Sequence, residues 1–176
     1  MKNWKILETK EIFKHPRLIL LEDDVLLPNG LKTKYLKFAD DGNAVTIICK
    51  RDDGKILLGK EYTHPTQEWI FQFPGGHVPI EEEPLVGANR ELMEEAKYSA
   101  KNLDLLGTYL INNRRSTAKM YVYLATDLKE DALAGDAEED IKNDWFSESE
   151  IDQLIREGQV INCHILSSWS LYKLKK

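Results

Sequence analysis

The sequence contains only two cysteines and no uninterrupted run of about twenty apolar residues, the length that a membrane-spanning helix needs. The N-terminal stretch MKNWKILETKEIF also lacks the apolar core of a signal peptide. Cys49 and Cys163 lie in apolar surroundings, without the spacing of metal ligands. We therefore expect a cytoplasmic protein with no membrane contact and two buried thiols, and neither a disulfide framework nor a zinc site.

The sequence has fewer cationic than acidic side chains. The 24 Lys and Arg residues are outnumbered by 30 Asp and Glu residues, which gives a formal net charge of −6 over 176 residues. This balance argues against a nucleic-acid partner, because affinity for a polyanion depends on neutralising its phosphates with cationic side chains. It remains compatible with a small anionic substrate that arrives with metal ions. The length predicts one domain with a small appendage.

Strands dominate the first half of the chain. The stretches RLILLEDDVLL and LKTKYLKF flank Pro28-Asn29-Gly30, a strong signal for a hairpin turn. AVTIICK and KILLGKEY flank Asp52-Asp53-Gly54 and predict a second hairpin. Further strands are expected at 69–73, 103–111 and 119–128, and the polar segment 129–140 is expected to be a loop.

Helices are predicted at three places. Pro84 suits the first position of a helix over 84–96. Ser147 and Glu150 form a capping-box pattern for a second helix, which Gly158 can close. A last amphipathic helix follows Asn162, and its inward residues are expected to be Ile165, Leu166, Trp169 and Tyr172. Strands interspersed with a few helices predict an α/β protein with a mixed sheet between helices.

Six glutamates are crowded into residues 75–98, GGHVPIEEEPLVGANRELMEEAKY. On a helical wheel of about 100° per residue, the expected core arc contains Leu85, Ala88, Leu92 and Ala96. Glu91, Glu94 and Glu95 occupy the adjoining arc, where solvent screening is incomplete, and Arg90 is spaced to pair with Glu94. Taken alone, this acidic face is typical of a solvated helix surface.

A divalent cation would relieve the repulsion among these carboxylates. Carboxylate oxygens are hard ligands that suit Mg²⁺, with Mn²⁺ as an alternative. Glycine lets the backbone approach an ion or a phosphate closely, and Gly75-Gly76 directly precede the acidic segment. The combination predicts metal-assisted attack on a phosphate or diphosphate.

The spacing of these residues is more specific than their charge. Gly76, Glu82, Arg90, Glu91, the apolar Leu92, Glu94 and Glu95 fit G-x5-E-x7-R-E-U-x-E-E, where U is a bulky apolar residue. A chance match is on the order of 1 in 10⁵ at average residue frequencies. This pattern is the signature of the Nudix hydrolases, and the chain resembles that family. One position departs: the family usually has glycine where Lys97 stands. Either lysine takes the left-handed helix cap, which costs roughly 1 kcal/mol, or the helix ends differently.

The resemblance implies a Nudix α/β/α sandwich with an N-terminal antiparallel β subdomain. It also implies roles for individual residues. The Gly75 carbonyl, Glu91 and Glu95 would be the main metal ligands, Glu94 a further ligand or an orienting group, and Arg90 would orient the carboxylates. Glu82 would support the loop or bind a second metal. In the acidic loop, Glu138 and Glu139 are candidates for the general base; the alternative is a solvated loop.

Outside this signature, which is called the Nudix box, the chain is most similar to the branch of ADP-ribose and nucleoside-diphosphate-sugar pyrophosphatases. Such proteins are often homodimers, which implies residues 1–41 as a dimerisation subdomain and 42–176 as the Nudix domain. Departures from the branch bear on the substrate: Gln72 stands where glutamate is common, and Arg114 occupies a position that is often glycine. Arg114 and Arg115 are therefore candidates for binding phosphate or sugar, or else form an exposed turn. Tyr62 and Trp69 are candidates for stacking a base, although strand aromatics usually belong to a core.

These observations predict a Mg²⁺-dependent hydrolase that cleaves the diphosphate linkage of a nucleoside diphosphate sugar similar to ADP-ribose. The products would be a nucleoside monophosphate and a sugar phosphate. Two alternatives remain: a Nudix-fold sensor that binds a nucleotide without turnover, and a hydrolase of altered nucleoside triphosphates. The presence of all three glutamates favours an enzyme over the sensor, and the N-terminal strands disfavour the triphosphate hydrolase.

Overall fold

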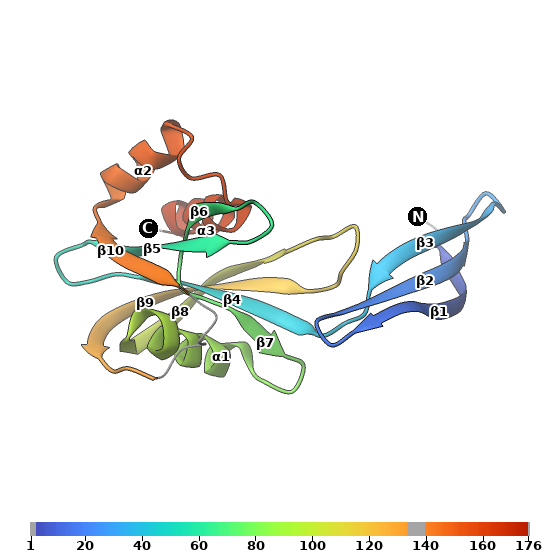
Figure 1. Cartoon of the computed structure of the whole chain (residues 1–176), viewed down its shortest axis with the longest axis horizontal. Helices are drawn as coiled ribbons and strands as arrows, with labels where there is room; N and C mark the ends of the chain where they lie inside the picture. Colours follow the sequence, from blue (N-terminus) through green and yellow to red (C-terminus); the bar gives the residue numbers. More distant parts are fainter. Residues whose placement is uncertain (1–2, 134–139, 176) are drawn as a thin grey trace. The chain divides into compact units, whose positions relative to one another are not determined.

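Figure 1 shows the computed structural model, which describes residues 3–133 and 140–175. The chain divides into two compact units, the first comprising Met1–Asp41 with Leu110–Ala118 and the second comprising Gly42–Tyr109 with Lys119–Lys176. In the described part of the chain, no helix is both long and apolar enough to span a membrane.

The first unit is a three-stranded antiparallel sheet in the order β1-β2-β3. Its strands are β1 (Lys5–His15), β2 (Leu18–Leu26) and β3 (Lys32–Phe38). The hairpin predicted around Asn29-Gly30 is confirmed: Leu26 pairs with Lys32, and Gly30 has a φ of 86° that glycine adopts without strain. Residues 110–118 join this unit through backbone contacts, because the Phe38 amide donates to the Arg115 carbonyl at 2.7 Å.

The second unit contains two sheets. A four-stranded mixed sheet has the order β7-β4-β9-β8, and a three-stranded antiparallel sheet has the order β10-β5-β6. In the mixed sheet β4 runs parallel to β9 and antiparallel to β7. The strands are β4 (Gly42–Cys49), β5 (Ile56–Thr63), β6 (Glu68–Gln72), β7 (His77–Pro79), β8 (Tyr98–Leu110), β9 (Lys119–Glu130) and β10 (Ile141–Phe146).

The second predicted hairpin is wrong in its pairing. The turn at Asp52–Gly54 exists, with the Gly54 amide donating to the Arg51 carbonyl at 2.9 Å. The strands on either side, however, enter different sheets and share only the bridge between Lys50 and Ile56. Most of β4 and the first half of β5 are buried, and a short buried apolar run does not reveal which strand it pairs with.

Helices cover the mixed sheet on both sides. Helix α1 (Pro84–Glu91) continues into the π-helical turn η1 (Leu92–Ala96), and α2 (Glu148–Arg156) and α3 (Cys163–Lys175) follow near the C-terminus. α1 packs on β4 and β7 while α3 packs on β4, β6 and β9, and Figure 1 shows α1 and α3 on opposite sides of β4. The predicted capping box is confirmed, since Ser147 and Glu150 bond each other's backbone amides at the start of α2.

The core lies between α1 and the mixed sheet and includes Val45, Ile47, Val78, Ala88 and Leu92. Three burial predictions are wrong. Leu85 and Leu166 are exposed although both were assigned to inward helix faces. Cys163, at the start of α3, is also exposed, whereas Cys49 is buried as predicted; both thiols are free.

Candidate active site

The acidic helix has an irregular end. Helix α1 begins at Pro84, as predicted, and runs to Glu91. The next turn is η1, which is π-helical and is capped by Lys97, whose amide donates to the Leu92 carbonyl. Lys97 has a φ of 65°, so of the two alternatives the left-handed cap is the one present, without glycine. Glu94 and Glu95 both lie on this turn, and π-turns within helices are frequent at functional sites.

Arg90 gathers the acidic side chains around one guanidinium. Its Nε and Nη2 donate to the two carboxylate oxygens of Glu82 at 3.2 Å and 3.0 Å. Its Nη1 donates to Glu91 at 2.7 Å and to Glu94 at 3.0 Å, and the predicted pairing of Arg90 with Glu94 is thereby confirmed. A fifth hydrogen bond goes to the His77 carbonyl at 3.0 Å.

The charges of this cluster reinforce one another. The hydrogen bonds of Glu82, and then those of Glu91 and Glu94, raise the pKa of Arg90 although its partial burial opposes the shift. The Arg90 guanidinium in turn lowers the pKa of Glu82 below its usual value. Arg90 therefore remains a cation and Glu82 an anion throughout the neutral range, and the carboxylates are held in fixed directions.

Backbone hydrogen bonds hold the glycine loop against β4. The Ile47 amide donates to the Pro74 carbonyl at 2.7 Å, and the Val45 amide donates to the Gly76 carbonyl at 2.9 Å. Gly75 has a φ of 154°, and a Cβ added there would lie 2.1 Å from the Val45 carbonyl oxygen. Only glycine fits at this position, because the backbone of the loop lies directly on that of the strand.

Glu91 and Glu95 face this loop. The Gly75 amide donates to Oε2 of Glu95 at 2.9 Å. A Cβ added to Gly76 would lie 2.5 Å from Oε1 of Glu91. Glu91 and Glu95 are only 8% and 9% exposed, so the prediction that the acidic arc borders the core is confirmed.

The donor set is chemically suited to a hard divalent cation. It consists of three carboxylates and the backbone of a glycine loop, all supplying oxygen. Among the described residues, no group of three or more acidic, imidazole or thiol side chains is arranged so that these side chains alone could hold a metal ion. Mg²⁺ does not require such a cage, because it usually keeps several waters and takes ligands from substrate phosphates. Glu91, Glu94, Glu95 and the Gly75 carbonyl are the groups that would hold it.

Two further features border the loop. Cys49 is fully buried, and burial followed by the nearby charge of Glu95 raises the pKa of its thiol, so Cys49 stays protonated. A cavity of about 110 Å³ lies on the loop, and its lining includes Thr46, Gln72, Gly75, Gly76 and His164. Gln72, the departure from the usual glutamate, therefore lines a cavity directly beside the proposed metal-binding loop.

The aromatic candidates pair with each other on the antiparallel sheet. Tyr62 on β5 lies opposite Trp69 on β6, with ring centroids 6.2 Å apart in an edge-to-face arrangement. Both rings are exposed, and the Lys142 ammonium lies 4.3 Å from the centre of the Trp69 ring. Neither ring belongs to the core, in contrast to Phe71, which is buried.

The two candidate arginines belong to the first unit, and their contacts differ. Arg115 donates to the Leu36 carbonyl at 3.2 Å, and its guanidinium lies 5.4 Å from the centre of the Tyr35 ring. Arg114 contributes its carbonyl, which accepts a hydrogen bond from the Tyr35 hydroxyl at 2.7 Å. The candidates for the general base, Glu138 and Glu139, lie outside the described residues.

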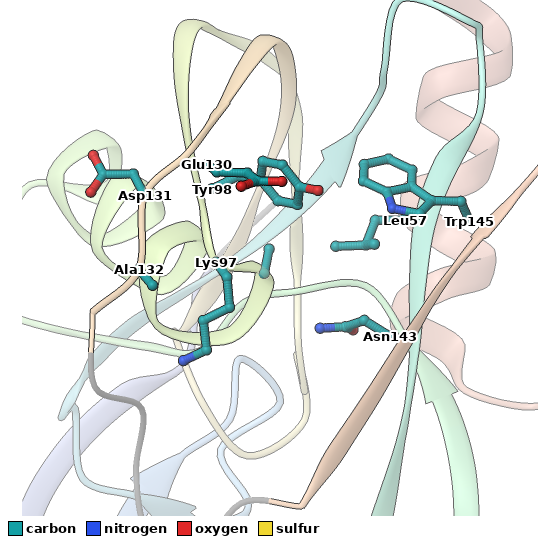
Figure 2. A pocket seen from close by; sticks show the side chains of 9 residues that line it. Leu57, Lys97, Tyr98, Glu130, Asp131, Ala132, Asn143 and Trp145 are labelled. Carbon is teal, nitrogen blue, oxygen red and sulfur yellow. The ribbon is translucent and has the colours of Figure 1, made fainter.

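Two side chains at the end of the box helix were missed as site residues. Asn143 on β10 donates from its amide to the Glu95 carbonyl at 2.8 Å, and the Lys97 ammonium donates to the carbonyls of Glu94 and Leu133. No strand was predicted at β10, so no signal in the sequence pointed to Asn143. Figure 2 shows both residues at a pocket of about 530 Å³, which is also lined by Tyr98, Glu130, Asp131 and Trp145.

Comparison with known proteins identifies the family. The model of the NUDIX domain matches residues 41–162. The ADP-ribose pyrophosphatase of Bacillus subtilis (strain 168) is 32% identical over 124 residues, which cover 70% of this chain and 66% of that enzyme. The methanol dehydrogenase activator of Bacillus methanolicus is 29% identical over 158 residues, 89% of this chain and 85% of the relative.

A crystal structure of an ADP compounds hydrolase matches the fold with a TM-score of 0.89, at 23% identity, over 98% of this chain and 94% of that one. The expected Nudix sandwich with a separate N-terminal antiparallel sheet is therefore confirmed. The resemblance to the ADP-ribose pyrophosphatase-like branch is also confirmed. The chain belongs to the NUDIX family.

Proposed function

We propose that the protein hydrolyses the diphosphate linkage of a nucleoside diphosphate sugar similar to ADP-ribose, yielding a nucleoside monophosphate and a sugar phosphate. The observation that carries this proposal is the cluster in which Arg90 binds Glu82, Glu91 and Glu94 beside the Gly75-Gly76 loop. The substrate class is supported by the similarity to an ADP-ribose pyrophosphatase over 70% of the chain.

Mg²⁺, or Mn²⁺ in its place, would activate water and neutralise charge that builds on the diphosphate. The residues of the chain prepare the site for this ion. Arg90 fixes the directions of Glu91 and Glu94 through Nη1, and the Gly75 amide fixes Glu95 through Oε2. These hydrogen bonds would restrict the carboxylates to a narrow range of directions before the ion binds.

The other assignments are proposals that follow from the family resemblance. Glu138 or Glu139 would take the proton of the attacking water. Of the two candidate arginines, Arg114 would bind phosphate or sugar, while Arg115 would hold the turn through its contacts with the Leu36 carbonyl and the Tyr35 ring. Tyr62 and Trp69 would offer a ring for stacking a base, which their exposure permits.

A substrate panel tests the proposed function directly. ADP-ribose, other nucleoside diphosphate sugars, dinucleotides and nucleoside triphosphates are each incubated with Mg²⁺, and the products are separated by chromatography. We expect the highest kcat/KM for a nucleoside diphosphate sugar, with a nucleoside monophosphate as product. A preference for triphosphates would contradict the proposal, and so would nucleotide binding without turnover. Glu91→Gln, purified in the same way, controls for contaminating hydrolases.

We also propose that the first unit forms a homodimer interface. Every residue of β1 is exposed in the single chain. A three-stranded sheet with a largely uncovered apolar surface buries little on its own, so association with a second copy would stabilise it. The exposed apolar side chains of this sheet and its turns include Trp4, Ile6, Leu7, Ile12, Phe13, Leu18, Leu31, Leu36 and Phe38.

A further inference from the structure

The last turn of the box helix has an unusual set of hydrogen-bond partners. The final carbonyls of a helix have no donors within the helix and must find them elsewhere. Here the Met93 carbonyl accepts from the Leu133 amide at 3.1 Å, and the Lys97 carbonyl accepts from the Asp131 amide at 3.0 Å. Of the three carbonyls between them, those of Glu94 and Glu95 accept from the side chains of Lys97 and Asn143.

Lys97 connects the turn to the segment that follows β9. Its ammonium donates to the Glu94 carbonyl and, at 2.9 Å, to the Leu133 carbonyl. A cation at a helix C-terminus is also favoured by the helix dipole. Lys97 makes these contacts from a backbone conformation with a φ of 65°, which disfavours a side chain. The contacts of the ammonium are therefore made at the cost of local backbone strain.

Asn143 reaches the same turn from β10. Figure 2 shows its amide pointing from the strand toward the helix end that carries Lys97. The fold leaves space for this side chain, because a Cβ added to Gly59 on the neighbouring strand β5 would lie 2.6 Å from Oδ1 of Asn143. The hydrogen bond from Nδ2 to the Glu95 carbonyl, at 2.8 Å, therefore depends on a glycine at position 59.

We propose that Lys97 and Asn143 are positioning residues for the reaction: as side-chain caps, they fix the backbone of Glu94 and Glu95 and thereby the directions of the two carboxylates. Glu94 and Glu95 are the only residues of η1 with ligand side chains, and each has one of these caps on its own carbonyl. The predicted effect of these residues on turnover rests on the proposed hydrolase function. Their predicted effect on metal affinity does not, because metal affinity can be measured without a substrate.

The test compares four variants with the wild type. Lys97→Met keeps the length and the backbone strain but removes the donor, whereas Lys97→Gly removes both the donor and the strain. Asn143→Ala removes the second cap, and Gly59→Ala displaces Asn143 without altering it. We expect each variant to weaken Mn²⁺ binding, measured by calorimetry, by roughly tenfold and to lower kcat by roughly ten- to a hundredfold. KM for the best substrate should change less than about threefold, because substrate contacts elsewhere are retained.

Three comparisons separate positioning from stability. Lys97→Arg keeps a cationic donor of similar reach and should recover most of the Mn²⁺ affinity. Lys97→Gly should keep its Tm within a few degrees of the wild type while losing affinity, since the relieved strain offsets the lost contacts. Gln67→Gly is the matched control: Gln67 also has a left-handed backbone, with a φ of 56°, but lies in the loop between β5 and β6, and we expect its Mn²⁺ affinity and kcat to be unchanged.

The proposal is overturned if Lys97→Met and Asn143→Ala both bind Mn²⁺ and turn over substrate within twofold of the wild type. It is also overturned if their losses merely follow the fraction of unfolded protein, as judged by Tm and circular dichroism. Failure of the proposed function gives a different result: the wild type would then hydrolyse no member of the panel, while the Mn²⁺ affinities would still rank the variants as described.

Discussion

The α-carbon of Gly76 lies directly against the carboxylate of Glu91. A Cβ built on Gly76 would lie 2.5 Å from Oε1, 2.6 Å from Cδ and 2.8 Å from Oε2 of that side chain. The Gly76 carbonyl is held by the Val45 amide at 2.9 Å, so the loop is restrained on its other side by β4. Glu91 stands fifteen positions after Gly76, and any side chain at position 76 would have to displace its carboxylate.

Gly76→Ala should therefore displace the Glu91 carboxylate from Arg90. We expect kcat on the best substrate to fall at least tenfold, because misplacement of a catalytic group by about 1 Å can cost a hundredfold in rate. Gly107→Ala is the control, since its Cβ would meet Leu171 at an ordinary distance of 3.4 Å. Equal kcat values for the two variants would contradict a functional role for the contact between Gly76 and Glu91.

Glu95→Gln tests the metal-binding face without altering its shape. One ligand charge is lost, while an amide oxygen can still accept from the Gly75 amide, which donates to Glu95 at 2.9 Å in the wild type. We expect turnover to fall at least a hundredfold, roughly the upper range for loss of a metal-site partner. Mg²⁺ should also raise the Tm of the wild type more than that of the variant, because an ion that binds only the folded state stabilises it. Unchanged turnover in Glu95→Gln would refute the metal assignment.

The ion pair between Glu82 and Arg90 predicts a pH-dependent contribution to stability. The Arg90 guanidinium lowers the pKa of Glu82 from its usual 4.5. A carboxylate with a depressed folded-state pKa stabilises fully above its unfolded pKa, and this stabilisation is lost as the pH falls through the folded-state value. The Tm difference between wild type and Glu82→Gln should therefore be largest above pH 4.5 and shrink as the pH is lowered further. Glu68→Gln, an exposed position on β6, serves as control in the same calorimetric series.

Much of the local structure was predictable because its signals are local. Pro84, the Ser147 and Glu150 capping box and the Asn29-Gly30 turn each depend on residues within one turn of one another, and all three appear where expected. The box spacing likewise fixed which glutamates share a helix face. Arg90 had one predicted partner, Glu94, and the structure adds Glu82 and Glu91, whose side chains reach the guanidinium from the same short segment.

What could not be predicted depends on partners far along the chain. The turn after β4 reverses the chain locally, but whether β5 pairs with β4 or with β10 is decided by residues 141–146, which pair with β5. A helical wheel predicts which side of the helix Leu85 occupies, but it does not predict how far the packed sheet extends beneath that side. Leu85 is therefore exposed although it lies on the expected core arc. The left-handed backbone of Lys97 could be anticipated from the glycine that the family usually has there. The hydrogen bond of its ammonium with the Leu133 carbonyl, 36 positions later, could not.

The proposed homodimer can be tested by reversing the chemistry of β1. Phe13→Glu places a charge among the exposed apolar side chains of the first unit and should shift the protein from twice the chain mass of 20.3 kDa to a monomer. Lys14→Ala changes the next residue of the same strand, also exposed, and should leave the assembly intact. Light scattering at micromolar concentration measures both. A monomeric wild type under these conditions would refute the homodimer.

Arg114 and Arg115 are adjacent, but the structure gives them different roles within the first unit. The Arg115 guanidinium is used internally, on the Leu36 carbonyl and the Tyr35 ring. The Arg114 guanidinium forms no hydrogen bond or ion pair among residues 3–133 and 140–175, whereas its carbonyl is held by the Tyr35 hydroxyl. The backbone of Arg114 is thus fixed while its side chain remains available to an external anion.

Arg114→Ala should therefore raise KM by roughly ten- to a hundredfold, because hydrogen bonds between charged groups are the strong ones. It should leave kcat nearly unchanged, the pattern expected when an interaction stabilises ground state and transition state equally. Arg115→Ala should instead lower Tm, since it removes contacts with Leu36 and Tyr35. If Arg114→Ala leaves KM unchanged on the best substrate, the turn is a solvated one and its departure from the branch says nothing about specificity. ADP-ribose itself would then become the stronger candidate, because the remaining chemistry of the site is that of the branch.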